Sequence, residues 1–575
     1  MPTDSYYIGI DVGTGSARAS LVKKDGTVVA SSTYDTITYR DPNDHRIFEQ
    51  STSNIWVSIS AAIKDCLATS QVPPSEVKGL GFDATCSLAV SDFDGKPIIV
   101  TKGDQLGQYG DRNVILWADH RAEKEAGLIN KTKSEVLNYV GGTMSLEMEI
   151  PKILWLKNNM DPSLFPQCQF FDLPDFLTYR ATSSVTRSAC SLTCKCSYVP
   201  SSGWNAKFFG AIGLEDLCKG NYQQIGAEAG NLLTAGRPVG KGLSKAAAEE
   251  LGLFEGTPVG SGLIDAYAGW LGTVAARYKE DGKLSEVVPS LEESKHRLAA
   301  VAGTSTCHLI QSPKGVFVDG VWGPYRLIDF ILTTHPAYSK LVELGREQGK
   351  NIHTVLQEML EKLRVENKFE TLTELTKDLH MYPDFHGNRS PIADPRMRGS
   401  FVGLELDSGL SDLARKYNVT LEAIALQTRH IVDEMNARGH QIRSIYMSGG
   451  QAKNRALMQL FADTCGVPVV LPFEHSGAVV LGAAMLGRFA AEVCQTSGTE
   501  EGERGVTYIA PCSLSPEEQG QLLWKIMTEM TPVGTLVAPS ASMKEKKLLE
   551  AKYRIFRESI EIQQRWRKEM DDASK

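Results

Sequence analysis

Apolar and polar positions alternate along the first half of the chain with two different periods. Short apolar runs rich in β-branched residues predict strands at Tyr7–Val12, Ala17–Lys23, Val77–Phe82 and Leu88–Ser91. Apolar residues at helical spacing predict helices in the same half at Ile55–Leu67, Pro151–Asn159 and Asp175–Tyr179. Strands interleaved with helices are typical of an α/β domain.

The second half of the chain shows the same alternation. A charged, irregular stretch, Lys279–Arg297, is expected to be a linker or a surface insertion between the halves. The elements expected after it are strand, turn and strand over Leu298–Ile310, a hairpin through Val316–Trp322, helices at Leu421–Arg438, Leu457–Cys465 and Ala478–Glu492, and strands at Ser444–Ser448 and Val467–Leu471. The charged tail Met543–Met570 carries apolar residues at near-helical spacing, which predicts a helix packed back on the body.

Length and charge narrow the class of protein. A chain of 575 residues is too long for one hydrophobic core, so two domains or more are expected. We expect them at residues 1–276 and 277–540, followed by a C-terminal helix at 541–575. The net charge is -8 and no long basic run occurs, which argues against a nucleic-acid surface but not against nucleotide binding.

Three further features predict a cytoplasmic location without a membrane span. The cysteines are scattered, and Cys190, Cys194 and Cys196 lack the paired spacing of a zinc site, so reduced thiols are expected. The beginning of the chain lacks the pattern of a secretory signal. The longest weakly apolar run, Val259–Ala276, contains Asp265 and four glycines, so a buried helix is expected there.

A turn near the start of the chain could hold a phosphate. An apolar strand runs into Asp11, and the turn Gly13-Thr14-Gly15-Ser16 leads into a second strand that contains Arg18. Backbone N–H groups and hydroxyls in such a turn can bind phosphate, and Asp11 could hold Mg²⁺ directly or through water. No Walker lysine or dinucleotide fingerprint is present, and a plain hairpin is the alternative. The pattern recurs around Gly303-Thr304, which suggests two related domains that bind one polyphosphate.

Three other segments carry candidate chemistry. Asp265 follows an apolar run at what reads as a helix start, where it could accept a proton from a substrate hydroxyl or simply be stabilised by the helix dipole. Asp83 ends another predicted strand, so it is a substrate-binding candidate with a capping role as the alternative. Gly449-Gly450 joins a strand to a helix and could pack against an adenine ring or a phosphate, although such turns are often ordinary connections.

Together these segments resemble the FGGY family of carbohydrate kinases, and most closely its D-ribulokinase branch. The segments that carry the resemblance are IGIDVGTGSARA, GFDATCSLAV, WADHRA, GGTMSLEMEIPKILWLK, SLTCKCSY, LIDAYAG, AGTSTCHLI, YPDFHGNRSP and SGGQAKN. The resemblance implies two ribonuclease-H-like domains, as in actin and Hsp70, with ATP and sugar in the cleft between them.

The resemblance also implies roles for individual residues. Asp265 matches the catalytic base, Asp83 and Lys195 match sugar contacts, and Asp11 matches the carboxylate near Mg²⁺. The residues that match contacts to ATP are Thr14, Gly15, Ser16, Arg18, Gly303, Thr304, Gly449, Gly450 and Asn454. The expected activity is ATP-dependent phosphorylation of a pentulose, most specifically D-ribulose to D-ribulose 5-phosphate. The expected partners are the sugar and ATP, and the sequence makes no prediction of oligomeric state.

The sequence departs from the family pattern in one place. After Tyr325, relatives continue through a segment that carries a glutamate and a Gly-Gln-Ser-Ala-type turn, whereas here Arg326 follows directly. This chain is therefore either a variant of the gene product or an impaired enzyme. The alternatives to a D-ribulose kinase are a kinase for a related sugar such as xylulose or ribitol, an actin- or Hsp70-like ATPase acting on proteins, and a sugar-binding relative without activity.

Overall fold

The computed structural model describes residues 5–226, 232–280, 282–285, 287–302, 306–312, 327–385, 387–388, 390–392, 394, 396–472, 477–497, 499–502, 506–509 and 514–575. Contacts divide the chain into two compact units. The first comprises Met1–Arg277, Glu286–Leu291 and Gly477–Val533, and the second comprises Tyr278–Ser285, Glu292–Ser476 and Gly534–Lys575. The division differs from the expected one because residues 477–533, assigned from the sequence to the second domain, pack with the first unit.

A five-stranded sheet forms the centre of the first unit, in the order β12-β6-β1-β2-β3. Its strands are β1 (Tyr6–Val12), β2 (Ser16–Lys23), β3 (Val28–Asp35), β6 (Val77–Ala84) and β12 (Val259–Ile264). Strands β1 and β12 both run parallel to β6, and β2 is antiparallel to β1 and β3. The carboxyl ends of β1, β6 and β12 therefore lie at one edge of the sheet.

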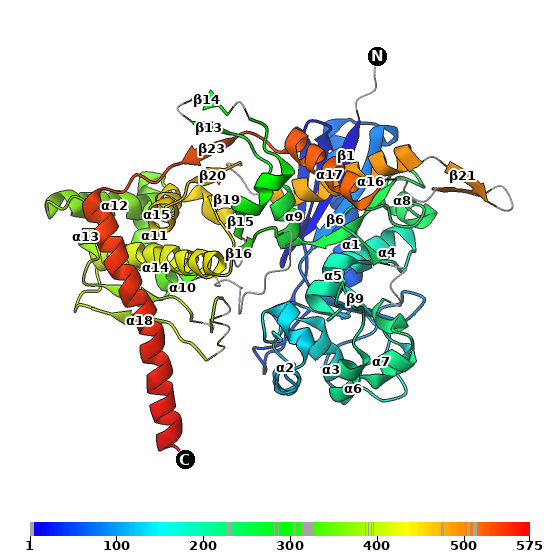
Figure 1. Ribbon diagram of the computed structural model, residues 1–575, viewed down its shortest axis with the longest axis horizontal. Coiled ribbons are helices and arrows are strands. Elements are labelled where there is room, and N and C mark those ends of the chain that lie inside the picture. The colour runs from blue at the N-terminus through cyan, green and yellow to red at the C-terminus, as the bar shows by residue number, and fades with distance from the viewer. Residues whose placement is uncertain are drawn as a thin grey trace. The chain divides into compact units, whose positions relative to one another are not determined.

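Two long helices cover the faces of this sheet, and the pleat decides which residues meet each helix. Alternate residues Ile8, Ile10, Leu80 and Phe82 share a core with α1 (Thr52–Ser70). The opposite face packs against α16 (Ala478–Ser497). Figure 1 shows α16 in orange over β1 and β6.

Glycines allow α16 to lie unusually close to the sheet. A Cβ atom on Gly9 would collide with the backbone carbonyl of Val480, and one on Gly81 would collide with that of Ala483. The helix is long and apolar enough to cross a membrane by length and composition alone. Since 78% of its most apolar stretch is buried, we identify it as the core helix of the first unit.

The expected helix at Val259–Ala276 proves to be a strand followed by a short helix. β12 occupies Val259–Ile264 and α9 (Asp265–Leu271) begins at the next residue. Glycines that flank an apolar run disfavour a continuous helix, and pairing with β6 then stabilises the extended conformation.

The rest of the first unit consists of a second sheet and shorter helices. The second sheet has the order β4-β5-β8-β7-β9, and its strands are β4 (Tyr39–Arg40), β5 (Phe48–Gln50), β7 (Leu88–Ser91), β8 (Val114–Ile115) and β9 (Gln169–Asp172). The other elements are α2 (Glu123–Lys131), α3 (Glu149–Asn159), α4 (Leu173–Thr182), α5 (Ala189–Lys195), α6 (Ala206–Ala211), α7 (Glu215–Lys219), α8 (Lys245–Leu251) and α17 (Pro516–Met530), with the two-stranded pairs β10 (Arg187–Ser188) with β11 (Leu232–Leu233), and β21 (Thr499–Gly502) with β22 (Val506–Ile509).

The second unit is built on a seven-stranded sheet in the order β14-β13-β23-β20-β19-β15-β16. Its strands are β13 (Tyr278–Glu280), β14 (Lys283–Leu284), β15 (Arg297–Ala302), β16 (Thr306–Leu309), β19 (Ser444–Gly449), β20 (Val469–Leu471) and β23 (Gly534–Val537). The stretch expected as a linker or surface insertion, Lys279–Arg297, thus contributes strands to this sheet, because β13 pairs with β23 from the far end of the chain. Such long-range pairing leaves no local sequence signal.

Helices and a small strand pair complete the second unit. They are α10 (Leu327–Thr333), α11 (Tyr338–Gln348), α12 (Ile352–Glu366), α13 (Leu372–Leu375), α14 (Leu410–Ala437), α15 (Arg455–Cys465) and α18 (Met543–Ala573), with β17 (His380–Tyr382) paired to β18 (Ser400–Val402). The C-terminal helix α18 is anchored by Lys552, whose ammonium donates to the carbonyl oxygen of Thr376 at 2.7 Å and to a carboxylate oxygen of Glu422 at 2.5 Å.

The two units repeat one strand arrangement. In the first, the β1–β2 hairpin lies beside parallel β6 and then β12, and in the second the β15–β16 hairpin lies beside parallel β19 and then β20. The predicted second Gly-Thr turn, at Gly303 and Thr304, and the predicted hairpin at 316–322 lie outside the described residues.

Candidate active site

Three carboxylates gather at the edge of the first sheet where its parallel strands end. Asp11 near the end of β1 is in register with Asp83 on β6, and Leu263 on β12 pairs with Asp83 on the other side. Asp265 follows as the first residue of α9. Since Gly9 pairs with Gly81 two residues earlier, Asp11 and Asp83 stand on the sheet face that the glycines open to α16.

Burial and mutual repulsion raise the pKa values of this cluster. Burial raises the pKa of Asp265 to about 7, and the charge of Asp11 acts in the same direction. The pKa of Asp83 lies well above its ordinary value because the side chain is fully buried and faces the charges of Asp11 and Asp265. Neither oxygen of Asp83 has a hydrogen-bond partner of ordinary geometry within the described part of the chain. The cluster thus holds acceptor oxygens in excess of donors, and it suits a cation or a polyhydroxy ligand.

The Gly-Thr turn lies at the same edge. Its backbone closes through a hydrogen bond from the Gly13 amide to the Ser16 carbonyl at 2.9 Å. The Trp117 indole N–H donates to the Thr14 hydroxyl at 3.1 Å, and this contact from the loop after β8 fixes the turn. Gly15, at the tip of the turn, is exposed. Trp117 lies in the segment WADHRA, which contributed to the family resemblance but was given no role of its own.

Arg18 stands opposite Asp11 across the β1–β2 hairpin. The two residues are a register pair, and the guanidinium lowers the pKa of Asp11 against the larger raising effect of burial. Its Nε also donates to the hydroxyl of Thr33 at 3.3 Å. The Arg18 guanidinium therefore places a fixed positive charge beside the carboxylates.

Lys195, the last residue of α5, supplies a buried positive charge to the same region. Burial lowers the pKa of Lys195, but Cys86, Glu147 and Asp172 outweigh that effect, so its pKa lies above the ordinary value. Lys195 in turn lowers the pKa of Asp265, although the effect of burial is larger. Sequence reasoning missed Glu147 and Asp172, whose proximity to Lys195 depends on how α3, β9 and α5 pack.

The second unit holds the predicted Gly449-Gly450 turn at the end of β19. Gly449 has φ of 89°, and a Cβ atom there would collide with the backbone carbonyl of Ala302, so glycine is required. Asn454 caps α15 by accepting a hydrogen bond from the Leu457 amide at 3.1 Å. Its amide nitrogen donates to the Tyr417 hydroxyl at 2.8 Å. The side chain of Asn454 therefore has a structural role of its own.

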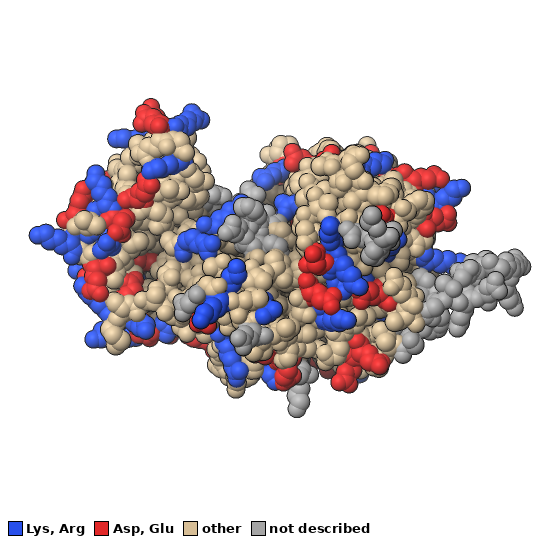
Figure 2. Space-filling view, turned by 90° about the horizontal axis from the view of Figure 1, so that it is seen from above, with Lys and Arg blue, Asp and Glu red and all other residues tan. Residues whose placement is uncertain are grey.

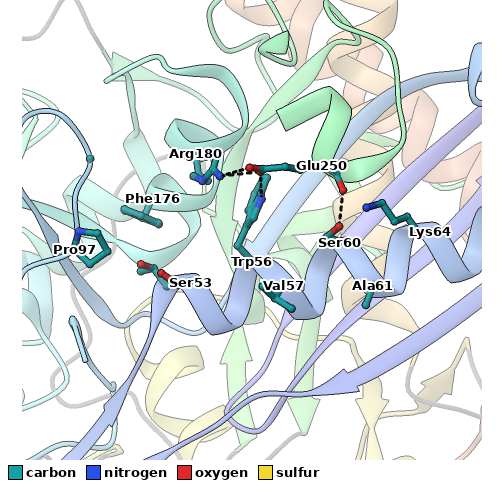
Figure 3. Close-up of a pocket in the computed structure, with 12 residues that line it drawn as sticks. Ser53, Trp56, Val57, Ser60, Ala61, Lys64, Pro97, Phe176, Arg180 and Glu250 are labelled. Carbon is teal, nitrogen blue, oxygen red and sulfur yellow. Dashed lines mark hydrogen bonds and ion pairs between the residues drawn. The ribbon is translucent and has the colours of Figure 1, made fainter. Parts of the chain in front are cut away.

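A pocket of about 630 Å³ lies elsewhere on the first unit, among α1, α4, α8 and the turn at Gly95–Pro97. Figure 3 shows Trp56 and Arg180 both directed at Glu250, whose carboxylate accepts from the indole N–H at 2.7 Å and from the guanidinium at 2.8 Å. The pocket shares no residue with the carboxylate cluster. The carboxylate of Glu250 is already engaged by Trp56 and Arg180. The carboxylate cluster, with its raised pKa values, is therefore the better candidate for catalysis.

Basic and acidic side chains are interspersed over the face of the molecule seen in Figure 2.

Comparisons with known proteins identify the family. Residues 6–272 match the N-terminal domain of the FGGY family of carbohydrate kinases, and residues 298–491 match its C-terminal domain. The chain belongs to the FGGY family of carbohydrate kinases. It is 41% identical to a D-ribulokinase of Saccharomyces cerevisiae over 529 residues, which cover 85% of this chain and 72% of that protein. It is also 38% identical to the human FGGY carbohydrate kinase domain-containing protein over 99% of this chain and 98% of that one.

Solved structures agree on the fold. A xylulose kinase from Rhodospirillum rubrum superposes with a TM-score of 0.66 at 18% identity, over 98% of this chain and 99% of that one. As an FGGY kinase, the chain has the two-domain α/β architecture of the actin and Hsp70 ATPases, and it is a phosphotransferase that uses ATP and a sugar hydroxyl as acceptor. The protein-directed ATPase considered from the sequence is thereby excluded.

Proposed function

We propose that this FGGY kinase phosphorylates D-ribulose to D-ribulose 5-phosphate. The observation that carries the proposal is the joint placement of Asp83, Asp265 and Lys195 in the first unit, which provides two carboxyl groups and one ammonium for a polyol. The 41% identity to a D-ribulokinase over most of the chain supports D-ribulose as the acceptor.

In the proposed reaction, Asp265 accepts the proton of the sugar hydroxyl as that oxygen attacks the γ-phosphate of ATP. A carboxylate with a pKa of about 7 matches this task, because it is partly ionised at neutral pH and still basic enough to take a proton. Lys195 and Asp83 orient the other hydroxyls. Because phosphoryl transfer depends mainly on positioning and charge neutralisation, these contacts contribute to kcat as well as to binding.

The ATP contacts follow the family assignment. In the first unit they are Thr14, Gly15, Ser16 and Arg18, whose turn backbone and guanidinium suit phosphate oxygens. In the second unit they are Gly449, Gly450 and Asn454, together with Gly303 and Thr304. The cap and the Tyr417 contact occupy the Asn454 side chain, so we assign that residue a supporting role for the turn.

Mg²⁺ fits the residues present. Asp11 offers a half-buried carboxylate beside the oxygens of Asp83, which make no hydrogen bond of ordinary geometry within the described residues. Mg²⁺ sites on nucleotides commonly use one or two carboxylates, with the remaining ligands from water and phosphate. Within the described residues no group of three His, Cys, Asp or Glu side chains forms a complete metal cage. When bound, Mg²⁺ would neutralise phosphate charge.

One experiment tests the substrate and the activity together. ADP release should be measured with the purified chain across D-ribulose, L-ribulose, D-xylulose and ribitol, with ATP alone as the blank. The proposal expects D-ribulose to give the highest kcat/KM. A higher value for xylulose or ribitol would transfer the assignment to that sugar, and equal rates with and without any sugar would refute sugar kinase activity by this chain.

An impaired enzyme is the second candidate, and the sequence motivates it at Tyr325–Arg326. The family resemblance implies a further segment there, which this sequence lacks. Tyr325 and Arg326 lie outside the described residues.

A further inference from the structure

We propose that Cys194 is an oxidation site, at which a hydroperoxide converts the thiolate to a sulfenic acid beside the proposed sugar-binding lysine. The thiol chemistry does not depend on the sugar, and only its effect on catalysis rests on the proposed function.

Three cysteines, Cys190, Cys194 and Cys196, lie on or directly after α5, and Cys86 lies near Lys195. Two of the four, Cys86 and Cys196, are protected from oxidants. Cys86 and Cys196 are both buried, and burial raises the pKa of Cys86 to about 12 and that of Cys196 well above its ordinary value. The Cys196 thiol also donates to the Glu149 carboxylate at 2.9 Å. A buried thiol that stays protonated is a poor nucleophile, so neither cysteine competes for oxidants.

Cys194 has a different environment. It is half-buried, and its Sγ lies 3.2 Å from the hydroxyl of Tyr267, an exposed residue of α9 two positions after Asp265. Cys190 stands one helical turn before it on the same face of α5 and is also half-buried. The Cys194 sulfur thus lies between two hydrogen-bond donors, the Cys190 thiol and the Tyr267 hydroxyl.

The charges around this pair favour the thiolate. The Cys190 hydrogen bond lowers the pKa of Cys194 to about 7, with further lowering from Tyr267 and Lys195, while burial and Asp172 oppose the shift. The pKa of Cys190 itself rises well above the ordinary value, since it carries the proton of the pair. A thiol with a pKa of about 7 is about half ionised at neutral pH, which is typical of redox-sensitive thiols.

The reaction balances with hydrogen peroxide as the oxidant. The thiolate attacks one peroxide oxygen, an S–O bond forms, the O–O bond breaks, and hydroxide leaves and takes a proton from water or buffer. The sulfur loses two electrons and the peroxide gains them.

The geometry predicts that the sulfenic acid persists. Cβ atoms four residues apart on a helix are about 5–6 Å apart, whereas a disulfide requires about 3.5–4.5 Å. Closing a Cys190–Cys194 disulfide would therefore deform α5. The added oxygen would stand between α5 and Tyr267, next to Lys195, and we expect it to hinder sugar binding.

The test compares Cys194 with another cysteine in the same chain. The full-length protein is treated with hydrogen peroxide, trapped with dimedone and analysed by peptide mass spectrometry between pH 5.5 and 9. Cys218 is the internal reference, because it is also half-buried but lies on α7. We expect Cys194 to be labelled at least about tenfold faster than Cys218 at pH 7, with a midpoint near pH 7. Labelling of Cys194 no faster than Cys218 overturns the proposal.

Two variants sharpen the test. Tyr267→Phe removes one donor and should slow labelling and move its midpoint to higher pH, and an unchanged profile would contradict the assigned geometry. Cys194→Ser should keep its ADP release after peroxide treatment while the wild type loses activity that dithiothreitol restores. Equal loss in both proteins overturns the functional part. If the untreated wild type shows no sugar-dependent activity, the proposed function fails and the labelling result still stands.

Discussion

Asp11 on β1 and Asp83 on β6 lie directly opposite each other in the parallel register. Two carboxyl groups so placed cannot both ionise cheaply in a buried setting, and the burial of Asp83, reinforced by the charge of Asp11, raises the pKa of Asp83 well above its ordinary value. Burying these two neighbouring carboxyl groups lowers the stability of the folded protein. A bound ligand that interacts with them would offset this cost.

The first prediction concerns the cost of that arrangement. Asp83→Asn should raise the thermal unfolding midpoint at pH 7.5. In the wild type, a raised folded-state pKa contributes stability that is present below the unfolded-state value near 4 and lost as pH rises through the folded-state value. Asparagine does not titrate, so the difference in unfolding midpoint between the variant and the wild type should shrink as pH falls from 7.5 to 4.5. A variant less stable than the wild type at both pH values would show that the carboxyl is paired.

The second prediction concerns the proposed base. Asp265→Asn should reduce D-ribulose-dependent ADP release by roughly 10²–10⁴-fold while the Kd for ATP stays close to the wild-type value. In the wild type, kcat/KM for the sugar should rise as pH increases through about 7, because the base must be unprotonated. A variant with wild-type turnover would remove Asp265 from the mechanism.

The third prediction separates the two substrates. Lys195→Ala removes a charged hydrogen-bond donor, a loss of roughly 1.5–3 kcal/mol, and should raise the KM for the sugar far more than that for ATP. The change also leaves Asp172 without a buried counter-charge, so the unfolding midpoint must be measured alongside. Equal effects on both KM values, together with a lower midpoint, would indicate a folding defect rather than a lost sugar contact.

The fourth prediction tests the close packing of α16. Gly9→Ala would drive a Cβ atom into the Val480 carbonyl and should destabilise the protein by about 1–3 kcal/mol. Gly127→Ala is the matched control, because it lies inside α2 (Glu123–Lys131) with open space around its Cβ position. The control should be neutral or slightly stabilising. Thermal unfolding of both variants measures the difference, and equal midpoints would mean that α16 can shift without cost.

The fifth prediction concerns the departure from the family pattern at Tyr325–Arg326. The protein in which Arg326 directly follows Tyr325 should bind ATP but phosphorylate D-ribulose poorly. Phosphoryl transfer depends mainly on the positioning of both substrates, to which the absent segment would contribute. Inserting the corresponding segment of a relative between these two residues should restore kcat. Both proteins are assayed for D-ribulose 5-phosphate under identical conditions. Equal rates would show that the segment is dispensable.

Local sequence determined much of the first unit. The apolar run before Asp11, the Gly-Thr turn and the following strand predicted the β1–β2 hairpin, since hydrophobic periodicity and turn residues act within a few positions. The start of α9 at Asp265 and the C-terminal helix were also visible, as α9 and α18 show. The family resemblance came from the same local segments and is confirmed by the matches to both FGGY domains.

Tertiary structure alone decided which of these segments meet. The order β12-β6-β1 brings Asp265, Asp83 and Asp11 together from positions up to 254 residues apart, and no local pattern encodes which strand is the neighbour of another. The same reason explains why residues 477–533 join the first unit and why Cys194 meets Tyr267. Strand pairing and helix packing depend on contacts between residues far apart in the sequence. Hydrophobic periodicity, helix capping and turns depend on residues only a few positions apart.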